Sequence, residues 1–166
     1  MALTTTVAGA SSDSYCTVAE ADTLVGWRGS DAWTNASDAT KEGVLKAAVS
    51  VLDELNYEYP KTDTDQALRL PTTSMTNSDG DYYIPERVKR AQAYLAMYML
   101  EDPDMFSGMA GLSQVSVPGG FSVTMAGGGS RTWKLPDDVY GLIRRYLWVA
   151  GPTTRYWDSA KRSWLP

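Results

Sequence analysis

The 166-residue sequence contains no histidine and only one cysteine, Cys16. Without histidine, the chain lacks the commonest general base and the commonest metal ligand of proteins, which argues against an enzyme without excluding a carboxylate enzyme. A single cysteine cannot form an internal disulfide, and we expect Cys16 to be a small buried apolar residue beside the first helix. The composition therefore favours a protein made in a reducing cytosol, with no metal or cofactor.

Long apolar runs are also missing. No stretch approaches the roughly 18 apolar residues that span a bilayer, so we expect no membrane partner. The opening segment, MALTTTVAGASSDSY, has neither the basic region nor the apolar region of a secretory signal. Residues 1–13 are small and polar, and we interpret them as a flexible leader to a single compact domain.

The net charge of −5 is unevenly distributed along the chain. Residues 1–138 contain 10 Lys/Arg and 19 Asp/Glu, a balance of −9, whereas residues 139–166 contain 5 and 1, a balance of +4. An acidic body repels nucleic acid, because binding to phosphates needs clustered cations. Only the C-terminal segment could attract a polyanion, and an acidic neighbouring protein would serve equally well.

Three segments have the apolar periodicity of helices that pack against one another. They cover about 17–27, 37–57 and 85–102, and a shorter helix is expected within 134–147. Thr17 and Glu20 have the spacing of a capping box, and Ser37 or Asp38 can cap the second helix. The pattern predicts a mainly α fold: a small helical bundle of three main helices and a short C-terminal helix.

Two further segments lack helical periodicity. Residues 60–84 read as a long ordered loop that Leu68 and Leu70 pin to the core. Residues 108–129 hold seven of the fourteen glycines, and the segments QVSV and FSVTM alternate on either side of a Pro-Gly-Gly turn. These signals predict a β-hairpin at about 112–126, whose tip or edge is available for pairing.

None of the short motifs indicates catalysis. The segment NSDGDYY lacks the spaced oxygen ligands and the terminal Glu of an EF-hand loop. The triple glycine is not followed by the Lys-Ser/Thr of a phosphate-binding loop. Asp137 and Asp138 follow a proline at a helix start, where the helix dipole explains them. We therefore expect a non-enzymatic protein without a catalytic, metal or cofactor site.

The segment IRRYLWVAGPTTRYWDSAKRSWLP carries three Trp, two Tyr and five Arg/Lys against one Asp. We interpret residues 148–166 as an extended basic aromatic arm, because Trp, Tyr and Arg are the residue types that anchor protein interfaces. The candidate partner-binding residues are Arg144, Arg145, Trp148, Arg155, Tyr156, Trp157, Lys161, Arg162 and Trp164.

Two other interpretations of this segment stay open. Its aromatic side chains could fold back onto the domain as ordinary core. Alternatively, its interleaved cations and aromatic rings could bind single-stranded nucleic acid by neutralising phosphates and stacking on bases. The acidic body and the modest number of cations make the nucleic-acid interpretation the weaker one.

In chain order, several segments resemble the tailed-bacteriophage head–tail connector proteins. This adaptor or head-completion family is also labelled as DnaT-like single-stranded-DNA-binding proteins. The segments are SYCTVAEAD, LKAAVSVLDELNYEY with QALRLP, IPERVKRAQAYLAMYML, SQVSVPGGFSVTM and LIRRYL, which together define an adaptor domain over 14–147. The chain departs from the pattern at Leu70-Pro71, where relatives often have Trp before the proline, and at Arg144-Arg145, where they often have a proline.

The resemblance implies a structural virion protein of the neck, made in the cytoplasm of a bacterial host. Such proteins form a ring, usually a dodecamer, under the portal protein, extend the DNA channel and dock the next neck or tail protein. Tight phosphate contacts would retard DNA in the channel, so the −9 body fits DNA that passes through the lumen without specific binding. The second label implies the alternative, a single-stranded-DNA-binding replication accessory.

Overall fold

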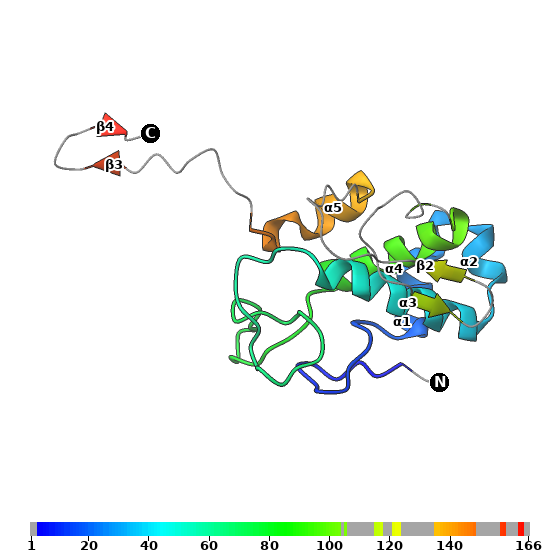
Figure 1. The fold of residues 1–166 in the computed structure, drawn as a ribbon, viewed down its shortest axis with the longest axis horizontal. Helices are drawn as coiled ribbons and strands as arrows, with labels where there is room; N and C mark the ends of the chain where they lie inside the picture. Colours follow the sequence, from blue (N-terminus) through cyan, green and yellow to red (C-terminus); the bar gives the residue numbers. More distant parts are fainter. Residues whose placement is uncertain are drawn as a thin grey trace.

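The computed structural model describes residues 3–103, 105, 115–117, 121–123, 135–148, 157–158 and 163–164. Its α-helices are α1 (Val18–Val25), α2 (Asp31–Asn35), α3 (Asp38–Asp53), α4 (Glu86–Glu101) and α5 (Asp137–Ile143), and its 3₁₀ helices are η1 (Gly26–Arg28) and η2 (Arg144–Tyr146). Helix α4 is central and packs against α1, α2, α3 and α5 (Figure 1). The chain is thus a small, mainly α domain, as the sequence predicts.

Local signals explain where the helices begin. The Thr17 side chain accepts a hydrogen bond from the Glu20 backbone, and the Glu20 carboxylate accepts one from the Thr17 backbone, which confirms the capping box. Ser37 caps α3 by accepting a hydrogen bond from the Thr40 N–H. The sequence analysis missed α2, a five-residue helix that Ser30 caps, because so short a helix has almost no periodicity.

The second predicted helix ends four residues earlier than expected, at Asp53. Beyond it the chain turns and forms an isolated antiparallel bridge between Tyr57 and Leu147. The Glu58 N–H donates to the Tyr146 carbonyl at 3.0 Å, and the Trp148 N–H donates to the Asn56 carbonyl at 2.8 Å. The Glu58 N–H is thus used outside the helix, and both bonds fix the chain around η2 to the residues after α3.

The core lies between the apolar faces of α1, α3, α4 and α5. Its fully buried side chains include Val25, Val44, Leu45, Val51, Leu52, Val88, Leu95, Met99, Val139 and Ile143. Leu70 is buried and Leu68 packs against the core, which confirms that the two leucines pin the long loop. The loop is also held by polar contacts, since the Leu70 N–H donates to the Tyr15 hydroxyl at 3.2 Å.

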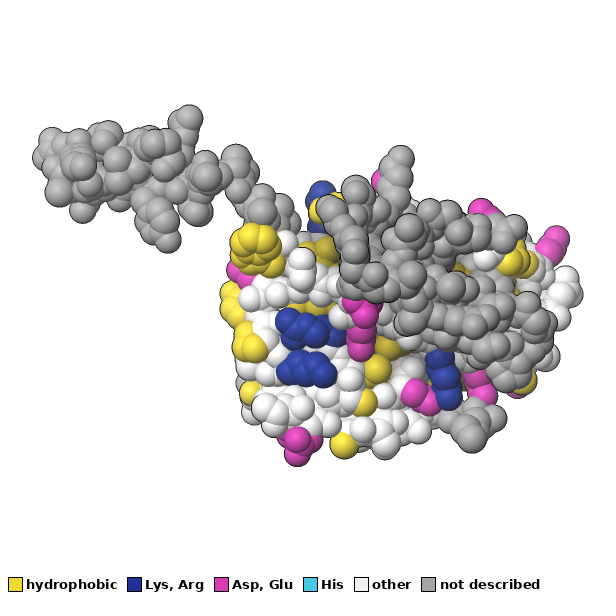
Figure 2. Space-filling model, viewed as in Figure 1, with side chains coloured by type: hydrophobic (Ala, Val, Ile, Leu, Met, Phe, Trp, Pro, Cys, Tyr) yellow, Lys and Arg dark blue, Asp and Glu magenta, His cyan; other side chains and the backbone are white. Residues whose placement is uncertain are grey.

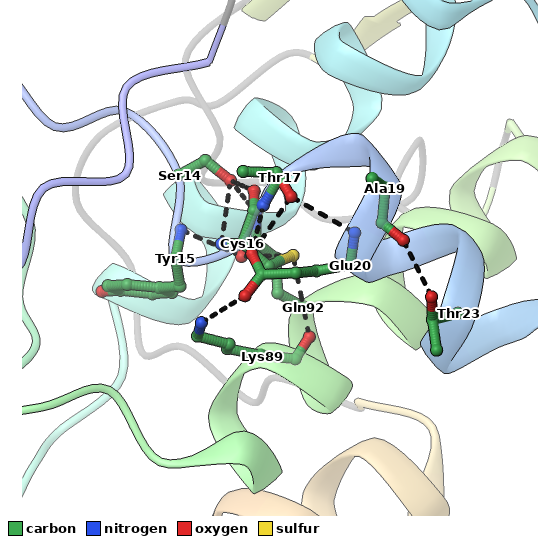
Figure 3. Close-up of polar contacts among 9 residues, drawn as sticks. All are labelled: Ser14, Tyr15, Cys16, Thr17, Ala19, Glu20, Thr23, Lys89 and Gln92. Carbon is green, nitrogen blue, oxygen red and sulfur yellow. Dashed lines mark hydrogen bonds and ion pairs between the residues drawn. The ribbon is translucent and has the colours of Figure 1, made fainter.

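A buried polar network ties residues 14–16 to α4 (Figure 3). The Gln92 side chain accepts from the Tyr15 N–H at 3.0 Å and donates to the Ser14 hydroxyl at 2.7 Å. Cys16 is fully buried beside this amide, as expected, and burial raises the pKa of its thiol to about 12. The thiol is therefore an unreactive packing group.

Residues 3–13 contact the body of the domain. The Thr4 N–H donates to the Asp13 carboxylate at 2.8 Å, and Asp13 pairs with Lys46 of α3 at 2.6 Å. The Ala67 N–H donates to the Gly9 carbonyl at 3.1 Å, so this segment lies beside the long loop (Figure 1). The flexible leader at 1–13 stays a prediction about motion, and the described residues of this segment have defined contacts.

Two short antiparallel strand pairs complete the described structure. Strand β1 (Val115–Val117) pairs with β2 (Phe121–Val123), and β3 (Trp157–Asp158) pairs with β4 (Ser163–Trp164). The residues that connect and flank these strands lie outside the described residues. The hairpin as predicted over 112–126 and the arm over 148–166 therefore stay predictions, as does the domain boundary at 147. No helix among the described residues could cross a membrane.

Candidate interface at the start of helix α4

A cleft of about 500 Å³ lies between the first turns of α4 on one side and the end of α5 with η2 on the other. We call it the α4–η2 cleft. Its lining consists of Tyr83, Pro85, Glu86, Arg87, Arg90, Leu142, Arg145 and Tyr146. Three arginines and one glutamate give the lining a charge of +2, on a chain whose net charge is −5.

Both walls of the cleft are fixed by backbone contacts. On one side, the Tyr83 N–H donates to the Met75 carbonyl at 3.1 Å, and Pro85 begins α4 without a side-chain cap. On the other side, η2 is held by its bonds to the residues after α3, while Ile143 is buried in the core. The arginine side chains therefore project from rigid elements.

The ion pairing of the cleft is incomplete. Arg90 pairs with Glu86 at 2.6 Å, and the Arg145 guanidinium lies over the Tyr146 ring at 5.5 Å from its centroid. Among the described residues, neither Arg87 nor Arg145 forms a salt bridge, and the buried Nε of Arg90 has no hydrogen-bond partner. Elsewhere on the domain, Arg28, Lys41, Lys46 and Lys89 each pair with a carboxylate, while Lys61 and Arg69 donate to backbone carbonyls.

The position of Arg87 on its helix is unfavourable. It is the second residue of α4, where the partial positive charge of the helix N-terminus repels a cation. A residue that breaks a local rule without compensation inside the domain is typical of a functional surface. An anion in the cleft would supply the missing compensation.

Two tyrosine rings line the cleft. Burial raises the pKa of Tyr146, and Tyr83 adds to the increase, while the nearby charges of Arg145 and Arg87 act against it. Tyr83 is about half exposed, with 42% of its surface accessible. Each ring offers an apolar face and a hydroxyl that can donate a hydrogen bond to an anion.

The chemistry of the cleft suits binding. Guanidinium groups pair with carboxylates or phosphates through two parallel hydrogen bonds, and tyrosine rings add contact area. Across the part of the chain that the structure describes, no three His, Cys, Asp or Glu side chains are grouped so that they could hold a metal ion. A surface that recognises a carboxylate or phosphate partner is what these residues can form.

Residues 1–162 match the model of a protein family described as "Putative DnaT-like ssDNA binding protein". The chain belongs to this family. No curated protein and no solved structure matches it. The family match covers almost the whole chain, including the cleft, and the connector assignment suggested by the resemblance stays a hypothesis.

The structure describes three of the nine candidate partner-binding residues in full. Arg144 and Arg145 both lie in η2 and are exposed, but only Arg145 lines the cleft. Trp148 follows η2 and is 59% exposed, so its ring is not part of the core. Trp157 and Trp164 are described by backbone alone, opposite each other in β3 and β4. The remaining four, Arg155, Tyr156, Lys161 and Arg162, lie outside the described residues.

The sequence analysis missed Tyr83, Arg87, Arg90 and Tyr146. A usable signal was present in YYIPERVKR, where two arginines occupy the first turns of a helix that begins after a proline. On the face shown in Figure 2, the Lys and Arg side chains form small groups among acidic and apolar ones, and no continuous basic band crosses the described residues in this view. The cationic character is local.

Proposed function

We propose that this protein is a structural subunit of a phage neck, a head–tail connector that forms a ring under the portal protein. In this role it extends the DNA channel and docks the next neck or tail protein, with DNA passing through without specific binding. The protein is a virion component made in the bacterial cytoplasm, and the proposal gives it no catalytic role, metal or cofactor.

The observation that carries the proposal is the α4–η2 cleft, an incomplete cationic and aromatic surface on an acidic domain. Arg87 and Arg145 have no salt bridge among the described residues, whereas Arg28, Lys46 and Lys89 each pair with a carboxylate. Trp148, the first residue of the predicted arm at 148–166, is exposed. Aromatic residues and arginines held in position before binding are typical of protein interfaces.

Electron microscopy of particles from the phage that encodes this chain tests the proposal. A gold label on a C-terminal tag should appear at the junction of head and tail, once per particle. A matched particle carrying the tag on its major tail protein controls for label access. Mature particles that lack the protein altogether would contradict the connector function.

The second candidate function is single-stranded-DNA binding, favoured by the description of the family to which the chain belongs. Arginines and tyrosines that share one cleft could neutralise a phosphate and stack on a base. The balance of −9 over residues 1–138 disfavours a long polyanion, because a strand that leaves the cleft meets an acidic surface.

A titration with a fluorescent (dT)30 oligonucleotide at several salt concentrations separates the two functions. The connector proposal expects no binding tighter than about 100 μM at physiological salt, in the range of non-specific binding. Micromolar or tighter binding that weakens with salt, and is lost on deletion of residues 148–166 or in Arg87→Glu/Arg145→Glu, would favour DNA binding instead. The variant Arg144→Glu is the matched control, since it changes the same charge outside the cleft.

A further inference from the structure

The long loop presents an acidic turn to solvent a few residues before the cleft begins. Residues 76–83 are exposed, and among the described residues neither Asp79 nor Asp81 has a salt bridge. The Asn77 side chain accepts from the N–H groups of Asp79 and Asp81 at 2.9 and 2.8 Å. Gly80 has a φ of +87°, which a residue with a side chain adopts only with strain. The turn is therefore a rigid, doubly acidic projection.

The turn and the cleft are complementary. The turn offers two carboxylates and the 45% exposed ring of Tyr82. The cleft offers Arg87 and Arg145, which have no carboxylate partner among the described residues, between the rings of Tyr83 and Tyr146. Charges that are unpaired within one subunit but opposite in sign between two surfaces are the arrangement that specifies partners and register in assemblies.

We propose that the acidic turn at 77–81 of one copy of this chain docks in the α4–η2 cleft of a second copy. Asp79 and Asp81 then pair with Arg87 and Arg145, and Tyr82 packs against the tyrosines of the cleft. The inference rests on the proposed function, since a connector ring needs a contact between copies. A contact between two different surfaces repeats from copy to copy and closes into a ring when the rotation allows.

A second copy is the occupant that the charges favour over nucleic acid. A single turn carries only two carboxylates, so it needs only the local positive charge of the cleft. A DNA strand carries a charge at every nucleotide, and it would have to leave the cleft across a domain with a balance of −9 over residues 1–138. The turn places its two carboxylates within the cleft, whereas the charge of a strand continues beyond it.

Charge reversal tests the contact through the self-association of the full chain. Sedimentation should show a wild-type protein that associates with rising concentration and dissociates with rising salt. Arg145→Glu should weaken the association at least about tenfold, whereas its neighbour Arg144→Glu should leave it unchanged. Asp79→Lys/Asp81→Lys should weaken it as well, with Asp65→Lys, an exposed carboxylate elsewhere on the same loop, as control. Far-ultraviolet circular dichroism and the melting temperature verify that each variant folds.

The combined variant Arg87→Glu/Arg145→Glu/Asp79→Lys/Asp81→Lys decides the point. It reverses the charge of both surfaces, so it should recover the association that each half of the change removes. A wild-type chain that stays monomeric up to about 1 mM, equal effects of Arg144→Glu and Arg145→Glu, or no recovery in the combined variant would each overturn the docking. Neck labelling with unaltered self-association in the variants would reject the contact and keep the connector. Self-association through the cleft in a protein absent from particles would reject the connector and keep the contact.

Discussion

Two groups of arginine and tyrosine lie along one stripe of α4, and they differ in how many of their arginines pair with a carboxylate. Tyr94 and Tyr98 follow Arg90 at intervals of four residues, so the three share a helix face. In the first group, the Arg28 guanidinium lies 4.0 Å from the Tyr94 ring centroid, donates to the Tyr98 hydroxyl at 2.7 Å and pairs with Asp138 at 2.5 Å. In the second group, the α4–η2 cleft, Arg87 and Arg145 have tyrosines beside them and no such carboxylate among the described residues.

The presence of the Asp138 carboxylate makes the Arg28 group an internal contact of the domain. Asp138 also accepts from the Tyr98 hydroxyl at 2.9 Å, so it completes a network that joins η1, α4 and α5. The Arg28 group is thus a closed internal contact that holds α5 on the bundle. The cleft has arginines and tyrosines with a positive charge left over, which the proposed partner would neutralise.

The largest expected effect on stability comes from removing the Arg28 guanidinium. Arg28→Ala should lower the free energy of unfolding by about 2 kcal/mol, because it removes the ring contacts and the guanidinium that donates to Asp138 and Tyr98. Arg28 and Asp138 retain 21% and 34% exposure, so solvent weakens the pair and the loss falls short of that for a fully buried pair. Urea unfolding measures it, and Arg28→Lys should be intermediate. A change below about 0.5 kcal/mol would contradict a closed structural role.

Removing the acid of the same group should have a smaller effect that depends on pH. Burial acts to raise the pKa of Asp138, but hydrogen bonds from Tyr98, the Val139 N–H and Arg28 outweigh it and hold the pKa below its usual value. A lowered folded-state pKa stabilises the protein above the unfolded value of about 3.9 and loses this stabilisation as the pH falls through the folded value. Asp138→Asn should therefore cost about 1 kcal/mol at pH 7.

The pH dependence is the sharper part of this prediction. Unfolding curves of the wild type and Asp138→Asn should begin to converge near the unfolded-state pKa of about 3.9 and should meet below the lower folded-state pKa, where Asp138 is uncharged in both states. Asp137→Asn, one residue earlier on the exposed side of α5, is the control for the change in net charge. If the difference in the free energy of unfolding between the two proteins stayed the same down to the lowest pH, the charge of Asp138 would not be what stabilises the contact with Arg28.

In the α4–η2 cleft, removing a cation should stabilise the domain. Arg87→Gln takes a positive charge away from the positive end of the α4 dipole and keeps a good helix former, so the free energy of unfolding should rise by about 0.5 kcal/mol. Arg144→Gln is the counterpart, since Arg144 follows the last residue of α5, where a cation is favourable, and should have the opposite sign. A loss of stability in Arg87→Gln would mean that Arg87 has a structural role inside the domain.

Sequence reasoning predicted the helices of the bundle better than the α4–η2 cleft. Capping at Thr17 and Ser37 and the apolar stripes of α3 and α4 are encoded within a few neighbouring residues, so the sequence carries them in full. The cleft joins residues 83–90 to residues 142–146, and its form depends on a backbone bridge between Tyr57 and Leu147 that has no local signal.

The adjacent arginines of η2 illustrate the same limit. Arg144 and Arg145 are equivalent in the sequence analysis, yet only Arg145 lines the cleft. Their directions depend on how η2 turns after α5, which is set by its bonds to the chain beyond α3. In the same way, nothing in the sequence distinguishes Arg28 from the other fourteen Lys and Arg residues. Only the packing of α5 brings it to Asp138.

The smallest expected effect on stability is the most direct contrast with Arg28. Arg145→Ala removes a cation that also touches a tyrosine ring, but the side chain is exposed and has no salt bridge among the described residues. The free energy of unfolding should therefore change by less than about 0.5 kcal/mol, while self-association should weaken. Urea unfolding and sedimentation of one preparation measure both quantities. If the loss instead matched that of Arg28→Ala, both arginines would be internal contacts, and the cleft would have no charge left for a partner.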